Sequence, residues 1–140
     1  KGSNFYNGED TKKPDIRLDC YVKEDGKYVY KSSIIIEVKY SPMYNIFQHV
    51  GNTKATEQMY KYWSIKYVEE QDGKRVYYRR SIYEVICVYP GSHMHSKKIE
   101  SGCGVFLQLY PYKTKQGEEK LAGKHGMVQI FEKWLKSIKK

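Results

Sequence analysis

Long apolar runs and paired cysteines are both missing from this chain. No apolar stretch approaches the ~18 residues that a membrane-spanning helix needs, and there is no signal-peptide pattern. Cys20, Cys87 and Cys103 form no Cys-x-x-Cys pair, and an odd number of scattered cysteines indicates reduced thiols in a cytoplasmic protein. His93 and His95, with Cys103 nearby, supply one ligand pair where a zinc site normally needs two. We therefore expect a cytoplasmic protein with no membrane partner, no disulfide framework and no zinc centre, with Cys20 and Cys87 in its core.

Acidic residues are also scarce, because 25 Lys and Arg outnumber 16 Asp and Glu and leave a net charge of +9. A basic domain suits a polyanion such as DNA or RNA, although charge alone does not separate nucleic acid from an acidic membrane or protein. The 140 residues suffice for one domain with a hydrophobic core. Tyrosine is abundant at 15 residues, mostly for packing in strands. Only that tyrosine-rich composition favours a protein-interaction domain with no nucleic-acid role.

The hydrophobic pattern predicts one α/β domain over 14–140, after a polar segment over 1–13 that is interpreted as flexible. The alternation over Ile16–Lys23 predicts a half-buried strand, and Asp25-Gly26 predicts a turn into the next strand. Because these two strands form a hairpin, a mixed sheet flanked by helices is expected rather than a wholly parallel one. The other expected elements are strands over 28–40, 76–80, 81–89 and 105–112, helices from Asn52 or Thr53 to about Tyr67 and over 127–138, and loops over 92–104 and 113–126.

The most informative residues lie at the ends of the first two predicted strands. Asp15 begins the first strand, and Glu37 and Lys39 end the second, after the aliphatic run Ile34–Ile36. Because side chains alternate along a strand, Glu37 and Lys39 point the same way while Val38 points into the core. The hairpin can bring Asp15 close to Glu37. Two carboxylates at short range favour a bound cation, and Mg²⁺ takes a few carboxylates while keeping room for waters and a phosphate oxygen.

This pattern, Pro14-Asp15 followed by Glu37-Val38-Lys39, resembles the PD-(D/E)XK nuclease superfamily, which has the restriction-endonuclease-like fold. The predicted helix that follows carries Gln58 and Tyr62, which are four residues apart and share a helix face. This Gln-x-x-x-Tyr is similar to the extra motif of the RecB-type branch.

The resemblance covers roughly residues 14–112, and the later strand ending in Val88-Tyr89-Pro90 is also similar to McrC-like restriction subunits. The family usually has a helix before the first strand, often with an acidic residue near the metal. Here only a polar segment containing Glu9 and Asp10 precedes Asp15. Since the chain begins without Met, we expect the first helix to lie outside it.

The resemblance implies a Mg²⁺-dependent DNA endonuclease domain, with Mn²⁺ able to substitute, that acts as the cleavage module of a restriction or defence system. Water would attack the scissile phosphate in line and leave a 5′-phosphate. Asp15, Glu37 and the Val38 carbonyl would hold the metal, Lys39 would handle the water, and Gln58 and Tyr62 would brace the site. Further domains or subunits of such a system are expected partners. A homodimer is another, since double-strand cleavage by one site needs two copies or two rounds of nicking.

Other residues have weaker claims to a site. Arg79 and Arg80 are the favoured phosphate contacts among the basic clusters, although such clusters are usually solvated surface. Asp19 shares the strand face of Asp15, but an ion pair is the favoured explanation for it. His49 precedes the site helix and is either a surface residue or a phosphate contact. The alternative function is a catalytically inactive nucleic-acid-binding or scaffold domain on the same fold, which would not need Asp15, Glu37 and Lys39 together.

Overall fold

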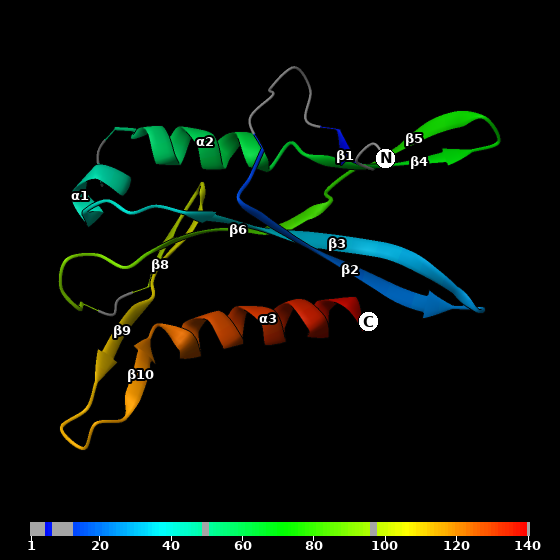
Figure 1. Ribbon diagram of the computed structural model, residues 1–140. Coiled ribbons are helices and arrows are strands. Elements are labelled where there is room, and N and C mark those ends of the chain that lie inside the picture. The colour runs from blue at the N-terminus through cyan, green and yellow to red at the C-terminus, as the bar shows by residue number, and fades with distance from the viewer. Residues whose placement is uncertain (1–4, 7–12, 49–50, 96–97, 140) are drawn as a thin grey trace.

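The central feature of the computed structural model is a mixed sheet of five strands in the order β2-β3-β6-β8-β7. The structure describes residues 5–6, 13–48, 51–95 and 98–139. Strands β3, β6 and β8 run parallel, and β2 and β7 pair antiparallel at the two edges. The carboxyl ends of the three parallel strands therefore lie together (Figure 1), and we call this boundary of the sheet its carboxyl edge. The bounds are β2 Ile16–Glu24, β3 Lys27–Val38, β6 Ile82–Tyr89, β7 Ile99–Ser101 and β8 Gly104–Gln108.

The hairpin of β2 and β3 confirms the first two predicted strands. Its turn places Asp25 at φ 50° and Gly26 at φ 79°, and positive φ at both central residues is what a tight hairpin turn requires. The register pairs Ile16 with Ile36. The pairing therefore carries the residue before β2 to the carboxyl end of β3.

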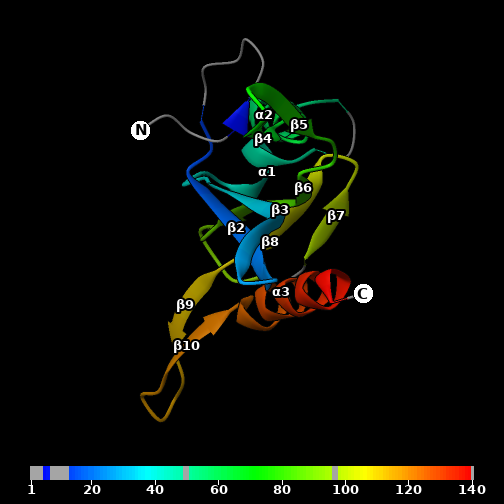
Figure 2. The same cartoon turned by 90° about the vertical axis from the view of Figure 1, so that its right-hand side faces the viewer.

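Helices cover both faces of the sheet, so the sheet is the middle of three layers (Figures 1 and 2). On one face, Ile35, Val85 and Cys87 pack with Met59 and Tyr62 of α2 (Lys54–Tyr62). On the other face, Ile34, Ile36, Ile86 and Val88 pack with Ile130 and Trp134 of α3 (Lys124–Ile138). Burial on both faces explains why β3 reads as a continuous aliphatic run rather than an alternation. The expected α/β class, a mixed sheet flanked by helices, is confirmed.

Helix α2 begins where the sequence predicts and ends earlier. Thr53 caps it, and its side chain accepts a hydrogen bond from the Thr56 N–H. The helix was expected to continue to about Tyr67 but ends at Tyr62. The segment Lys66–Gln71 is instead strand β4, which pairs with β5 (Lys74–Tyr78). Tyr67 is buried and stacks on Tyr30 with ring centroids 3.8 Å apart, so tertiary packing overrides the helical spacing.

Several short regular elements lie where the sequence analysis predicted none. Phe5–Tyr6 form β1, which pairs with β4, although 1–13 was interpreted as flexible. Met43–Ile46 form the short helix α1, and β7 lies within the expected loop over 92–104. The strand expected over 105–112 is divided into β8 and β9 (Tyr110–Lys113), and β9 pairs with β10 (Glu119–Ala122) in the expected charged loop. Among the described residues, no helix has the length and apolar character to cross a membrane.

Candidate active site

Asp15 and Glu37 meet at the carboxyl end of β3, where the sequence places the candidate metal ligands. The Asp15 backbone N–H donates to Oε1 of Glu37 at 3.2 Å. The Val38 N–H donates in turn to Oδ2 of Asp15 at 2.9 Å. These two hydrogen bonds hold Asp15, the residue before β2, against Glu37 and Val38, the last two residues of β3. The carboxyl groups of Asp15 and Glu37 therefore face the same small region at the carboxyl edge.

Glu37 is the buried charge of this cluster, with only 4% of its surface exposed. Its Oε2 lies 3.4 Å from Nζ of Lys39, and its Oε1 also accepts a hydrogen bond from the Tyr62 hydroxyl at 3.2 Å. A buried carboxylate is costly unless charged and hydrogen-bonding partners compensate for lost hydration. Here Asp15, Lys39 and Tyr62 supply those partners.

Helix α2 contributes Gln58 and Tyr62 from one face, because residues four apart on a helix are neighbours. The Gln58 amide nitrogen donates to the Tyr62 hydroxyl, and the Gln58 carbonyl oxygen accepts from Nζ of Lys39 at 3.3 Å. The contacts form a closed ring of Glu37, Lys39, Gln58 and Tyr62. Burial and then the nearby charge of Glu37 raise the pKa of Tyr62, so its phenol remains a proton donor.

The position of α2 over the sheet depends on its ends and its apolar face. The Thr53 hydroxyl donates to the carbonyl of Ile46, which links the start of α2 to α1. Ala55 and Met59 are buried in the same cluster as Ile35 of β3. Since Ile35 and Glu37 point to the same face of β3, this packing brings the polar face of α2 to Glu37.

No protein-family model, curated protein or solved structure matches this chain. The functional interpretation therefore depends on the geometry of the cluster and on the motif residues themselves.

The predicted phosphate contacts Arg79 and Arg80 lie away from this cluster. Only Ser81 separates them from β6, whose first residue Ile82 pairs with Ser33, whereas Cys87 pairs with Glu37. Ile82 and Cys87 are five residue steps apart, which is roughly 17 Å along the strand. The two arginines stand at the opposite end of the parallel strands and do not line the carboxylate cluster.

Asp19 and His95 make their hydrogen bonds with residues outside the cluster. Asp19 forms an ion pair with Arg17 at 3.1 Å and accepts a hydrogen bond from the Ser33 hydroxyl at 2.7 Å, so its interactions are structural. His95 contacts the Tyr89 hydroxyl at 3.3 Å. His49 lies outside the described residues. Cys87 and Cys103 are buried and Cys20 is half-buried, and all three are free thiols.

Gln108 is a buried polar residue that sequence reasoning missed. Its amide nitrogen donates to the carbonyls of Pro90 and His93, both at 2.7 Å, and its carbonyl oxygen accepts from the His95 N–H at 2.8 Å. Gln108 thereby holds the segment after β6 at the same carboxyl edge as Glu37. The signal in the sequence is a lone amide that directly follows the apolar run Val105–Leu107.

The donor set of the cluster suits a hard divalent cation. Mg²⁺ is commonly bound by one or two carboxylates and completes its shell with waters and substrate phosphate oxygens. Asp15 and Glu37 provide two carboxylates, and the Val38 N–H faces Asp15. Because the N–H and C=O of a strand residue point toward the same neighbour, the Val38 carbonyl lies on the side of Asp15. Among the described residues, no group of three or more His, Cys, Asp and Glu side chains forms an all-protein metal cage.

Proposed function

We propose that this chain is a Mg²⁺-dependent DNA endonuclease domain of the PD-(D/E)XK type, with the restriction-endonuclease-like fold, that serves a restriction or defence system. The observation that carries the proposal is the buried carboxylate of Glu37 at the end of β3, in contact with Asp15, Lys39 and Tyr62. The motif residues are spread over 47 positions of the chain, from Asp15 to Tyr62. The side chains of Glu37, Lys39, Gln58 and Tyr62 are nevertheless connected by hydrogen bonds and an ion pair, and Asp15 joins them through its backbone N–H. This convergence supports the assignment of the motif.

Each residue of the cluster has a role that its contacts suit. Asp15, Glu37 and the Val38 carbonyl would hold Mg²⁺ or Mn²⁺, which neutralises phosphate charge and makes bound water more acidic. Lys39, held by Glu37 and Gln58, would orient the attacking water and offset charge that develops on the phosphate. Gln58 and Tyr62 are positioning residues, since they touch Lys39 and Glu37.

Nicking of supercoiled plasmid in the presence of Mg²⁺ or Mn²⁺ tests the proposal. We expect Glu37→Gln and Lys39→Gln each to lower the nicking rate by at least two orders of magnitude, as loss of a group that acts on the transition state does. Glu24→Gln and Lys31→Gln are matched controls, because this exposed ion pair of 2.7 Å lies at the far end of the same hairpin. Nicking that survives both substitutions in the cluster would rule out this site.

A catalytically inactive nucleic-acid-binding domain is the second candidate. It is favoured by the closed ring of contacts, in which Lys39 compensates the charge of Glu37. Calorimetric titration with Mn²⁺ separates the two candidates. The nuclease proposal expects binding that Asp15→Asn abolishes and that Asp19→Asn, four residues further along the chain, leaves intact. A folded protein that binds DNA but neither binds Mn²⁺ nor nicks plasmid would be the inactive domain.

A further inference from the structure

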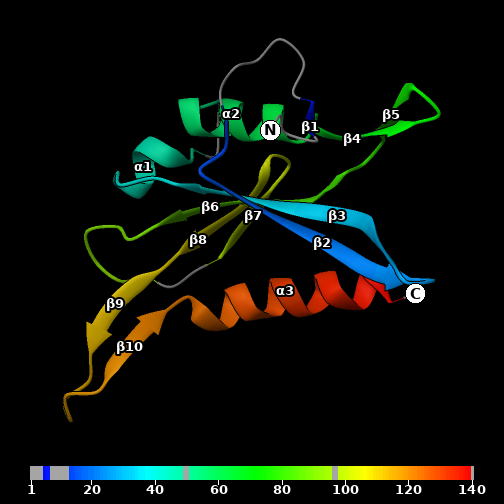
Figure 3. The same cartoon turned by 45° about the vertical axis from the view of Figure 1, so that its right-hand side comes forward.

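The hairpin of β9 and β10 leaves the body of the protein at the carboxyl edge, which carries Glu37. Strand β9 follows β8 with only Leu109 between them, and β8 is parallel to β3 through β6. The hairpin extends beyond the three layers (Figures 1 and 3). We call residues Tyr110–Lys124 the basic arm, because this segment contains four lysines (113, 115, 120 and 124) and two glutamates (118 and 119).

The base and the tip of the basic arm are fixed by close backbone contacts. At the base, Gly123 adopts φ +93°, and a Cβ atom there would lie 1.9 Å from the carbonyl oxygen of Gln108. At the tip, the Thr114 N–H donates to the Glu118 carbonyl at 2.9 Å, and the Gly117 N–H donates to the Thr114 carbonyl at 2.9 Å. The arm is therefore a formed hairpin whose direction is set by β8 and α3.

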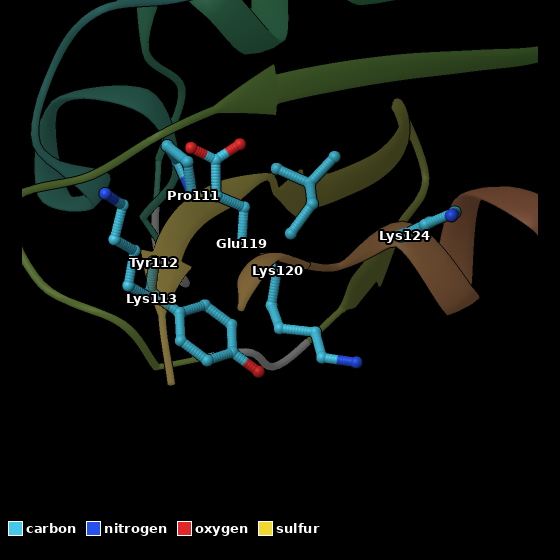
Figure 4. A pocket seen from close by; sticks show the side chains of 7 residues that line it. Pro111, Tyr112, Lys113, Glu119, Lys120 and Lys124 are labelled. Carbon is cyan, nitrogen blue, oxygen red and sulfur yellow. The ribbon is translucent and has the colours of Figure 1, made fainter. Parts of the chain in front are cut away.

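The basic arm covers none of the core and exposes both of its faces. None of its described residues is fully buried, and an isolated two-stranded hairpin is at best marginally stable in water. Tyr112 and Lys120 are directly paired across the strands and point to the same side, while Lys113 and Glu119 form the pair on the other side (Figure 4). A hollow of about 930 Å³ lies among these side chains and Lys124. Exposed lysines of this kind suit the phosphate groups of a polyanion.

We propose that the basic arm contacts the phosphate backbone of duplex DNA, through Lys113 and Lys120, while the same duplex reaches the edge that carries Glu37. This inference rests on the proposed function for the choice of DNA as the partner. A two-stranded ribbon fits the major groove, which is about 12 Å wide. Lys113 and Lys120 point to opposite faces of the ribbon, so within the groove they would face the phosphates of its two opposite walls. The pair of Lys120 with Glu118 spans 3.3 Å between exposed side chains, and such surface pairs are weak, so Lys120 is available to a phosphate. Contacts of this kind fix position and carry no sequence preference.

Binding of a labelled duplex oligonucleotide without divalent metal, at several salt concentrations, tests the arm independently of cleavage. Lys113→Gln/Lys120→Gln is expected to weaken binding about tenfold. It should also make the slope of log affinity against log salt shallower by about 1.8, or about 0.9 for each lost phosphate contact. Lys27→Gln/Lys74→Gln is the matched control, with the same change in net charge at exposed hairpin positions outside the basic arm. Lys113→Arg/Lys120→Arg keeps the charge and should keep the affinity.

The outcomes separate the arm from the active site. Equal affinity and equal salt slope in the arm variant and the control variant would overturn the arm proposal, as would loss of single-strand binding alone. A wild-type chain that binds no duplex would also overturn it. Selective loss of duplex binding in the arm variant, together with a wild type that nicks no plasmid, would support the arm and contradict the nuclease. If the arm variant nicks plasmid as fast as the wild type at subsaturating DNA, the nuclease proposal would be supported and the arm proposal contradicted.

Discussion

The Tyr62 hydroxyl donates a hydrogen bond to Oε1 of Glu37 at 3.2 Å, although the two residues are 25 positions apart in the chain. This contact connects α2 to the end of β3 and leaves the phenol between an amide donor and a carboxylate acceptor. Both side chains are almost completely buried. The hydrogen bond therefore couples the stability of the fold to the arrangement of the candidate site.

Tyr62→Phe is expected to lower the free energy of unfolding by about 1–3 kcal/mol, because Glu37 and Gln58 each lose a buried hydrogen-bond partner. Nicking should fall with it, since Lys39 is held by the same two residues. Urea denaturation followed by circular dichroism measures the change. Tyr28→Phe is the control, because Tyr28 is 73% exposed and its hydroxyl has no role in the cluster. Equal stability of the two variants would mean that the Tyr62 hydroxyl contributes nothing.

Alkaline pH is expected to destabilise the protein through its buried tyrosines. Burial raises the pKa of Tyr30 and of Tyr89 to about 12, from an ordinary value of 10.0. Below about pH 10, both the folded and the unfolded chain keep these protons, and stability does not depend on them. Between about pH 10 and 12, the unfolded chain releases protons that the folded chain retains. The free energy of unfolding therefore falls as the pH rises through this window.

Urea denaturation at a series of pH values between 8 and 12 checks this prediction. Each tyrosine whose pKa rises from about 10 to about 12 on folding contributes a loss of up to about 3 kcal/mol by the end of the window. Tyr89→Phe should lessen the alkaline loss, whereas Tyr28→Phe should leave it unchanged. A free energy of unfolding that stays constant up to pH 12 would contradict the assigned cause.

The convergence of the candidate site could be predicted in part from short-range geometry. The Asp25-Gly26 turn joins the two strands of the hairpin, but the pairing shifts by one residue at a bulge between Cys20 and Tyr21. Only beyond that shift does Ile16 pair with Ile36, which brings Asp15 to Glu37. The spacing of Gln58 and Tyr62 places both on one face of a helix. The turn and the period of a helix are legible in a single sequence, whereas the bulge between Cys20 and Tyr21 was not predicted. The chemical roles of the five residues remain predictions.

The elements that were missed depend on partners distant in the chain. Lys66–Gln71 continues the apparent helical spacing of α2, but Tyr67 packs on Tyr30 and the segment pairs with β5. Glu119–Ala122 has low intrinsic strand propensity and becomes a strand because it pairs with Tyr110–Lys113. Arg79 and Arg80 were favoured as phosphate contacts near the site, but they lie before the start of β6, at the opposite end of the parallel strands from Glu37. Nearness to the site helix in sequence does not fix which end of a parallel strand a residue occupies.

Gly123→Ala is expected to destabilise the protein more than Gly117→Ala, and the difference measures how firmly the basic arm is attached. Both glycines have positive φ, +93° and +84° respectively, so each substitution carries a conformational cost of about 1–2 kcal/mol. At Gly117 an added Cβ meets no atom within 4 Å, whereas at Gly123 it would lie 1.9 Å from the Gln108 carbonyl oxygen.

The clash at Gly123 forces β8 and the start of α3 apart, so the cost there should exceed that at Gly117 by about 2 kcal/mol or more. Thermal and urea denaturation of the two variants give this difference. A folded Gly123→Ala protein should also bind duplex DNA more weakly, because the arm would leave the sheet edge in a different direction. Equal stability of the two variants would show that the base of the arm yields easily, and the arm could then not be a fixed extension of the edge that carries Glu37.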